Sequence, residues 1–140
     1  MNDFPITFFH NPDCGTSRNA LAMVLGAGYV PTVVEYLKTG WTRPQLERLL
    51  AALSARPRDI MRDKGTPAGE LGLLDENVDD ERIIAAMLEF PILVNRPIVQ
   101  TPLGTKLCRP SEVVLSLLAR QPTSFTKEDG EVVTIGRPSP

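Results

Sequence analysis

The chain has 140 residues, 42% of them hydrophobic and 23% charged, and 15 basic against 17 acidic residues leave a formal net charge of −2. This length and composition fit one ordinary domain with its own core, which excludes a small scaffold that depends on disulfides or a metal. The lack of a basic excess argues against nucleic-acid binding, and the lack of a long apolar run or a signal-peptide-like start argues against a membrane or secreted protein. We therefore expect a cytoplasmic protein.

The first part of the chain predicts a strand, a helix and a second strand. Residues 6–9 form a short apolar and β-branched run that stops at the turn formers of residues 10–13. Helical spacing of apolar residues follows, with Thr16 or Ser17 available as the N-cap and glycines as stop signals. Residues 33–37 predict the second strand, which a crossover through the helix would make parallel to the first.

The middle of the chain is predicted to be helical. Residues 42–45 carry a capping-box pattern before an amphipathic helix, and residues 57–64 predict a short helix. Acidic residues at 79–81 begin another helix, which ends at Pro91. We expect this block, about 42–90, to be an insertion into a single domain that spans residues 1–120.

The last part predicts a hairpin and a helix. Residues 98–101 and 105–108 are the two strands of the hairpin, and Ser111 caps the helix that follows. We expect residues 121–140 to form a C-terminal extension, partly flexible, with Phe125 as its one candidate anchor.

With the helical block set aside, the order βαβ then ββα resembles the thioredoxin or glutaredoxin arrangement. The predicted fold class is therefore α/β, thioredoxin/glutaredoxin-like, with a four-stranded mixed sheet, an inserted helical block and a cysteine after the first strand. A fold of this kind does not define a function, so the site must be argued from its residues.

The segment from His10 to Asn19 places a thiol, Cys14, at the entrance to a helix. Backbone N–H groups there lack helical partners, and together with the helix dipole they favour a thiolate or a bound anion. A protonated His10 nearby would lower the thiol pKa further, and Arg18 adds positive charge. The alternative is a small buried cysteine in a tight turn, since free cysteines are often buried. The loop position and the adjacent glycine favour the reactive interpretation.

Ser17 takes the place where a dithiol redox protein carries its second cysteine. A Cys-x-x-Ser site cannot close its own disulfide, so an adduct on Cys14 must be resolved by an outside thiol or by Cys108, the second of only two cysteines. The serine either donates a hydrogen bond to the thiolate or caps the helix, and the two roles are compatible.

Three of the eleven arginines fall at places of interest: Arg62 in the middle block, Arg96 before the third strand and Arg109 after the fourth. In thioredoxin-type folds the proline that enters the third strand is a cis-proline facing the active cysteine, which would put Arg96 beside Cys14. Each arginine alone fits a solvated or salt-bridged side chain. Their joint placement around one thiolate is what favours binding of an oxyanion.

Four segments together resemble the glutathione/glutaredoxin-linked arsenate reductase family, of the ArsC type. They are HNPDCGTSRN at 10–19, NRPIV at 95–99, TPLGTKLCRPSEVV at 101–114 and FTKEDGE at 125–131. The resemblance runs from about residue 6 to residue 131. It implies reduction of arsenate to arsenite in three thiol steps: attack on arsenic by the protein's cysteine, addition of glutathione as co-substrate, and resolution by glutaredoxin as partner.

The resemblance also implies residue roles. Cys14 would be the nucleophile, His10 would stabilise its thiolate and Ser17 would assist, while Arg62, Arg96 and Arg109 would hold arsenate. No cofactor or metal would be permanently bound.

Two further residues of the pattern call for an expectation of their own. Asp13, directly before the nucleophile, should face solvent, because an inward carboxylate would oppose the thiolate. Cys108 should be a packed thiol, given its position in a strand.

Two other functions fit the same scaffold. One is a related thiol reductase that acts on another substrate, and the other is a redox-sensing transcription regulator that binds RNA polymerase. The regulator is disfavoured by Ser17, Arg96 and Arg109. A thiol reductase acting on a mixed disulfide is disfavoured because such a substrate has no need of three cations.

Overall fold

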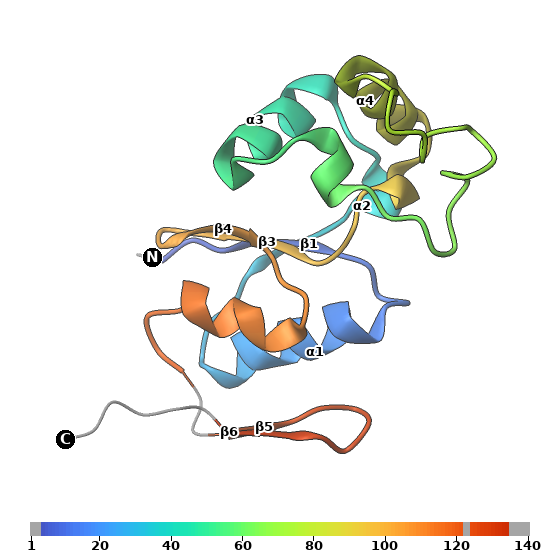
Figure 1. Ribbon diagram of the computed structural model, residues 1–140. Coiled ribbons are helices and arrows are strands. Elements are labelled where there is room, and N and C mark those ends of the chain that lie inside the picture. Colours follow the sequence, from blue (N-terminus) through green and yellow to red (C-terminus); the bar gives the residue numbers. More distant parts are fainter. Residues whose placement is uncertain (1–3, 122–123, 135–140) are drawn as a thin grey trace. The chain divides into compact units, whose positions relative to one another are not determined.

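The computed structural model of the chain describes residues 4–121 and 124–134 (Figure 1). They form two compact units, one from the residues up to Val34 and from Arg96 onward, the other from Glu35–Asn95. We call these the first and the second unit. The expected organisation, with a single domain over 1–120, an insertion at about 42–90 and an extension over 121–140, stays a prediction. Residues 135–140 of that extension lie outside the described residues.

A four-stranded mixed sheet is the centre of the first unit, as predicted. The strands are β1 (Thr7–His10), β2 (Thr32–Glu35), β3 (Ile98–Thr101) and β4 (Gly104–Leu107), in the spatial order β2-β1-β3-β4. Strand β3 pairs antiparallel with β1, where Phe8 lies opposite Val99, and with β4 in the predicted hairpin.

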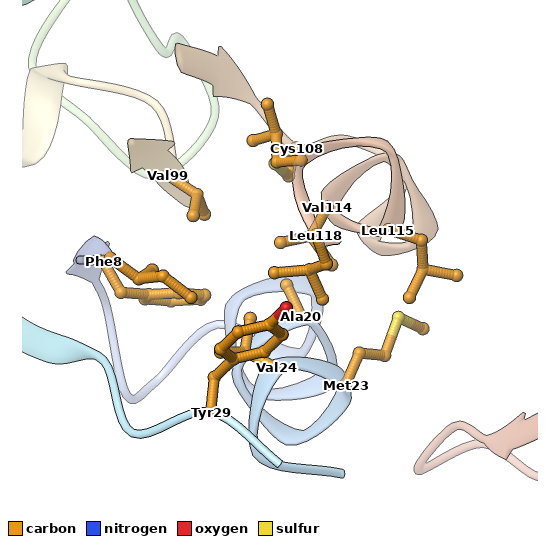
Figure 2. Close-up of a cluster of buried hydrophobic side chains, with 12 residues drawn as sticks. Phe8, Ala20, Met23, Val24, Tyr29, Val99, Cys108, Val114, Leu115 and Leu118 are labelled. Carbon is orange, nitrogen blue, oxygen red and sulfur yellow. The ribbon is translucent and has the colours of Figure 1, made fainter. Parts of the chain in front are cut away.

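Two helices cover one face of this sheet: α1 (Gly15–Gly26) and the 3₁₀ helix η3 (Ser111–Leu117), drawn in orange in Figure 1. The core of the first unit lies between these two helices and the sheet, where apolar side chains are shielded from water. Figure 2 shows this cluster, with Phe8 and Val99 from the strands, Met23 and Val24 from α1, and Val114 from η3.

The chain after η3 forms a second, two-stranded sheet that the sequence analysis did not predict. Strands β5 (Ser124–Thr126) and β6 (Val132–Thr134) pair antiparallel. Gly130 has φ 93° in the connection, a conformation that glycine adopts without strain, and its N–H donates to the carbonyl of Lys127 at 3.0 Å. Phe125 packs against the core cluster, as expected of an anchor.

The second unit is mainly helical. Its elements are α2 (Tyr36–Thr39), α3 (Arg43–Leu53), the 3₁₀ helix η1 (Pro57–Ile60), α4 (Asp80–Glu89) and the 3₁₀ helix η2 (Pro91–Leu93). The predicted capping box is present, because the Thr42 hydroxyl accepts a hydrogen bond from the Gln45 N–H at 3.2 Å and the Gln45 side chain accepts one from the Thr42 N–H at 3.3 Å. Asp79 caps α4 in the expected place.

Three local predictions are wrong. The second strand ends at Glu35, and Tyr36 begins a helical turn, with its hydroxyl donating to the carbonyl of Val94 at 2.8 Å. Residues 57–64 give only η1, after which Met61 pairs with Val94 as an isolated bridge. Ser111 is the first residue of η3 and not its cap, a position that Pro110 takes.

Among the described residues, no helix has both the length and the apolar character needed to cross a membrane. In the same residues no group of three or more His, Cys, Asp or Glu side chains could hold a metal ion.

Candidate active site

Cys14 is the N-cap residue of α1, with the extended backbone that this position requires (φ −103°, ψ 120°). The expected N-cap at Thr16 or Ser17 is wrong, because the helix already begins at Gly15. Cys14 thus places its side chain beside N–H groups that have no partner within the helix. Asp13, the residue before it, is exposed, as expected.

The loop before Cys14 is organised by Asn11, a buried residue whose role the sequence analysis missed. Its carbonyl accepts a hydrogen bond from the Cys14 N–H at 3.0 Å, and its Oδ1 accepts one from the Asp13 N–H at 2.9 Å. The second contact is the turn that asparagine side chains make with the backbone two residues on. The turn-forming run Asn-Pro-Asp was the available signal for it.

The Cys14 thiol is buried and yet acidic. Burial raises its pKa, but hydrogen bonds from the Arg96 side chain, the Ser17 backbone N–H and the Arg109 side chain outweigh burial, and the charge of Arg96 adds to them. The resulting pKa is about 7, lowered from an ordinary value of 9.0. A large fraction of the thiol is therefore the nucleophilic thiolate near neutral pH.

The two arginines flank the hairpin formed by β3 and β4: Arg96 precedes β3 and Arg109 follows β4, so both lie at the open end of the hairpin. Nη1 of Arg109 lies 3.7 Å from Cys14 Sγ and also donates to the carbonyl of Arg96 at 2.8 Å. The peptide bond between Arg96 and Pro97 is cis, as predicted, and so is that between Arg109 and Pro110, which was not predicted. The guanidinium groups of Arg96 and Arg109, which the sequence analysis predicted to lie near the thiol, thus both contact it.

His10 and Ser17 form a hydrogen-bonded pair at the two ends of the cysteine loop. Nδ1 of His10 lies 2.6 Å from Ser17 Oγ, and the Asn11 N–H donates to the same oxygen at 3.1 Å. All three residues are buried. The imidazole tautomer decides which of His10 and Ser17 donates in their contact. The serine hydroxyl therefore ties the end of β1 to α1, while its backbone N–H bonds to the thiol.

Arg62 belongs to the second unit. Its Nε donates to the carbonyl of Lys64 at 3.2 Å and its Nη1 to Asn95 Oδ1 at 3.4 Å, and its own backbone N–H donates to the carbonyl of Leu93 at 2.7 Å. The side chain is half-buried. Its predicted place in an arsenate site stays a prediction.

Cys108 is a packed thiol, as expected. It is fully buried in the core cluster, where Figure 2 shows it beside Val114, and its Sγ lies 3.6 Å from the carbonyl of Lys106. Burial raises the pKa of this thiol to about 12. Cys108 therefore stays protonated and unreactive at physiological pH.

A thioredoxin-like sheet, a single acidic cysteine at a helix N-terminus and two guanidinium groups at its sulfur define the chain as a thiol protein equipped to receive an anion. The ArsC family model matches residues 9–117, and the chain belongs to the ArsC family.

Relatives of known sequence and structure agree with this assignment. The arsenate reductase ArsI1 of Synechocystis sp. is 57% identical over 134 residues, which cover 95% of this chain and 93% of that protein. The arsenate reductase of Escherichia coli strain K12 is 52% identical over 129 residues, 91% of this chain and 92% of that protein. Among solved structures, an arsenate reductase from Vibrio cholerae superposes with a TM-score of 0.78 at 37% identity, covering 84% of this chain and 100% of that one.

Proposed function

We propose that this protein is an arsenate reductase, an oxidoreductase that converts arsenate to arsenite through a Cys14–arsenic intermediate. The observation that carries the proposal is the convergence of the Arg96 and Arg109 guanidinium groups on a thiol whose pKa is about 7. An enzyme for arsenate needs a thiolate nucleophile and a cationic cradle for a tetrahedral dianion in one place. The curated relatives that are 50–58% identical to this chain carry the same activity in their names.

Arg96 and Arg109 have two tasks in this proposal. Before arsenate binds, they stabilise the thiolate. Once it is bound, their planar forks donate to its oxygens and neutralise the charge that would otherwise repel the thiolate. Arg62 is the third proposed ligand, as the family resemblance implies, and its guanidinium donates to the carbonyl of Lys64 and to Asn95 Oδ1.

The proposed chemistry balances as follows. The Cys14 thiolate attacks arsenic, an S–As bond forms, and one oxygen leaves as water after protonation. Glutathione then replaces a second oxygen, which leaves a Cys14–S–As–S–glutathione species with arsenic still pentavalent. A glutaredoxin thiolate attacks the glutathione sulfur, which forms a glutaredoxin–glutathione disulfide and oxidises the two thiols, and the electron pair of the broken S–As bond stays on arsenic, which becomes trivalent. Hydrolysis then releases arsenite and regenerates Cys14.

Glutathione and glutaredoxin are proposed because the chain lacks a usable resolving thiol of its own. Ser17 stands where a dithiol protein has its second cysteine. Cys108 is fully buried, and its pKa is raised to about 12, which argues against attack by its sulfur. Outside thiols therefore supply the two electrons, no bound cofactor is needed, and a reducing compartment such as the cytoplasm is the proposed location.

His10 and Ser17 are proposed as supporting residues. Ser17 Oγ bonds to both His10 and the Asn11 backbone, so it fixes the helix start on which the thiolate depends. The backbone N–H of Ser17 bonds to the thiol itself. His10 acts through this serine and holds it in one orientation.

The test is arsenate-dependent NADPH oxidation with purified protein, glutathione, glutaredoxin and glutathione reductase. We expect turnover by the wild type and none by Cys14→Ser, with Cys108→Ser as the matched cysteine control that keeps turnover. If the wild type gives no more NADPH oxidation than Cys14→Ser, the proposal is wrong.

A further inference from the structure

One ion pair links the C-terminal hairpin to the start of α1. Arg18 donates from Nε to Glu128 Oε2 at 2.8 Å and from Nη2 to Glu128 Oε1 at 2.9 Å, which is the bidentate geometry of a strong arginine–carboxylate pair. The remaining nitrogen, Nη1, donates to the carbonyl of Pro12 at 2.8 Å. A single guanidinium therefore joins Glu128 to the loop that precedes Cys14.

This ion pair lies at the nucleophile's own turn. A Cβ placed on Gly15, the residue after Cys14, would meet Arg18 Nη2 and Glu128 Oε1, each at 3.7 Å. The Glu128 N–H also donates to Asn19 Oδ1 at 3.1 Å, one turn further along α1. Figure 1 shows the hairpin on the side of α1 that faces away from the sheet. The connection between β5 and β6 thus reaches the helix end that carries the thiol.

The hairpin has anchors that do not involve Glu128. Phe125 packs against the core cluster, and Lys127 Nζ bonds to Glu112 Oε1 at 2.8 Å, with only 12% of the lysine side chain exposed. These contacts hold the hairpin against η3. The Glu128 carboxylate takes no part in either contact, and it pairs with the Arg18 guanidinium.

We propose that Glu128 is a positioning residue for the Cys14 nucleophile, which it serves by clamping Arg18 in the orientation that binds the Pro12 carbonyl. An exposed arginine samples many rotamers, and a carboxylate that pairs with two of its nitrogens selects one of them. In that rotamer the Arg18 guanidinium donates to the Pro12 carbonyl and so holds the loop that places Cys14 beside its hydrogen-bond donors. The inference deepens the proposed arsenate reduction and rests on it.

The electrostatics agree with this geometry. The Glu128 hydrogen bond is the main reason why the pKa of Arg18 is raised, and the charge of Cys14 contributes in the same direction. The charged groups around the thiolate are then Arg96 and Arg109 at the sulfur, the Arg18–Glu128 pair at the helix start and exposed Asp13. The cations favour the thiolate, and the half-exposed Glu128 carboxylate opposes it.

The experiment compares Glu128→Gln with Glu81→Gln. Glu81 also forms a bidentate pair in the second unit, with Nη1 and Nη2 of Arg43 at 2.9 Å for both bonds. Two quantities are measured for each variant: the pKa of Cys14, from the pH dependence of its alkylation, and kcat and KM for arsenate. Urea unfolding of each variant accompanies them.

We expect Glu128→Gln to raise the Cys14 pKa by about half a unit and to lower kcat about three- to tenfold. Loss of the clamp on a charge-assisted hydrogen bond near the nucleophile should outweigh loss of the Glu128 charge, which solvent screens because that side chain is half-exposed. KM for arsenate should stay within about twofold, because Arg96 and Arg109 are untouched. Glu81→Gln should change neither quantity. In an Arg18→Gln background, Glu128→Gln should have no further effect, since its effect passes through Arg18.

Three results would overturn the inference. They are a Cys14 pKa that is unchanged or lowered in Glu128→Gln, equal effects of Glu128→Gln and Glu81→Gln, and additive effects of the Arg18 and Glu128 substitutions. A fourth would be the same change in Lys127→Met, which would assign the effect to hairpin docking. Alkylation needs no arsenate, so a wild type without arsenate turnover would refute the proposed function and leave this measurement intact.

Discussion

The two cysteines of the first unit are both buried, but their thiols differ in almost every chemical respect. Cys14 is 8% exposed and Cys108 is fully buried. Burial raises the pKa of both thiols, yet the final values are about 7 and about 12. Burial alone therefore cannot account for the lowered pKa of Cys14.

The difference lies in which hydrogen-bonding groups face each sulfur. Donors surround Cys14: a backbone N–H at the start of α1 and the guanidinium groups of Arg96 and Arg109. Cys108 faces a carbonyl, that of Lys106, and apolar neighbours such as Val114, as Figure 2 shows. Donors stabilise a thiolate and outweigh the effect of burial at Cys14, whereas at Cys108 burial is what raises the pKa. The fold thus makes one cysteine a nucleophile and the other a core residue.

The largest expected consequence is selective alkylation. At pH 7 about half of Cys14 is thiolate, whereas the thiolate fraction of Cys108 is smaller by roughly four to five orders of magnitude. Iodoacetamide at this pH should therefore modify Cys14 alone in the folded protein, and both cysteines in urea. Peptide mass spectrometry after short exposures measures this ratio. Comparable labelling of both residues in the folded protein would contradict the comparison.

The second prediction concerns stability and pH, where the two thiols have opposite signs. Because the Cys14 pKa falls from 9.0 to about 7 on folding, its contribution is fully present above pH 9 and is lost as the pH falls through 7. Across this range the free energy of unfolding of the wild type should gain about 2 kcal/mol relative to Cys14→Ser. Cys108, with its raised pKa, lowers stability above pH 9, where the unfolded thiol ionises.

Urea unfolding in the presence of a reducing agent, at several pH values between 6 and 9, measures this difference between the wild type and Cys14→Ser. Both proteins keep Cys108, so its contribution cancels. A stability gap that stays constant over the range would mean that Cys14 has the same pKa in the folded and the unfolded chain.

The third prediction removes one donor from Cys14 and keeps the charge. Arg96→Lys retains a cation but loses the planar fork, so KM for arsenate should rise about tenfold. The urea midpoint should stay close to that of the wild type, because the side chain is only half-buried and the lysine keeps its charge. Steady-state kinetics and urea unfolding on the same preparation test both statements. An unchanged KM would remove Arg96 from the arsenate site.

Local patterns predicted the elements that build the site. The strand before Cys14, the helix after it, the hairpin of β3 and β4 and the cis bond before Pro97 were all predicted. Each depends on residues that are adjacent in sequence or on a fold-wide rule. The exposure of Asp13 and the burial of Cys108 were also predicted, because charge and strand position decide them.

Contacts between distant segments could not be predicted in the same way. Ser17 reads as a helix cap in the local pattern, but its hydroxyl is already used by His10 and Asn11. Glu128 lies in a polar stretch that had no predicted strand, and its pairing with Arg18 spans 110 residues of chain. Such a contact depends on how the hairpin packs against α1, and the hydrophobic periodicity of the sequence carries no information about that packing.

The smallest expected effect comes from the other cysteine. Cys108→Ala removes a sulfur from a filled core and should lower the free energy of unfolding by about 1–2 kcal/mol, because apolar contacts are lost and a small cavity remains. It should leave kcat/KM for arsenate unchanged, since the sulfur takes no part in the proposed chemistry. The two readouts separate the roles: stability reports packing and kinetics reports thiol chemistry. A fall in kcat/KM without a matching fall in stability would make Cys108 a resolving thiol after all. Both cysteines would then take part in the reaction, and they would differ only in the step at which each one acts.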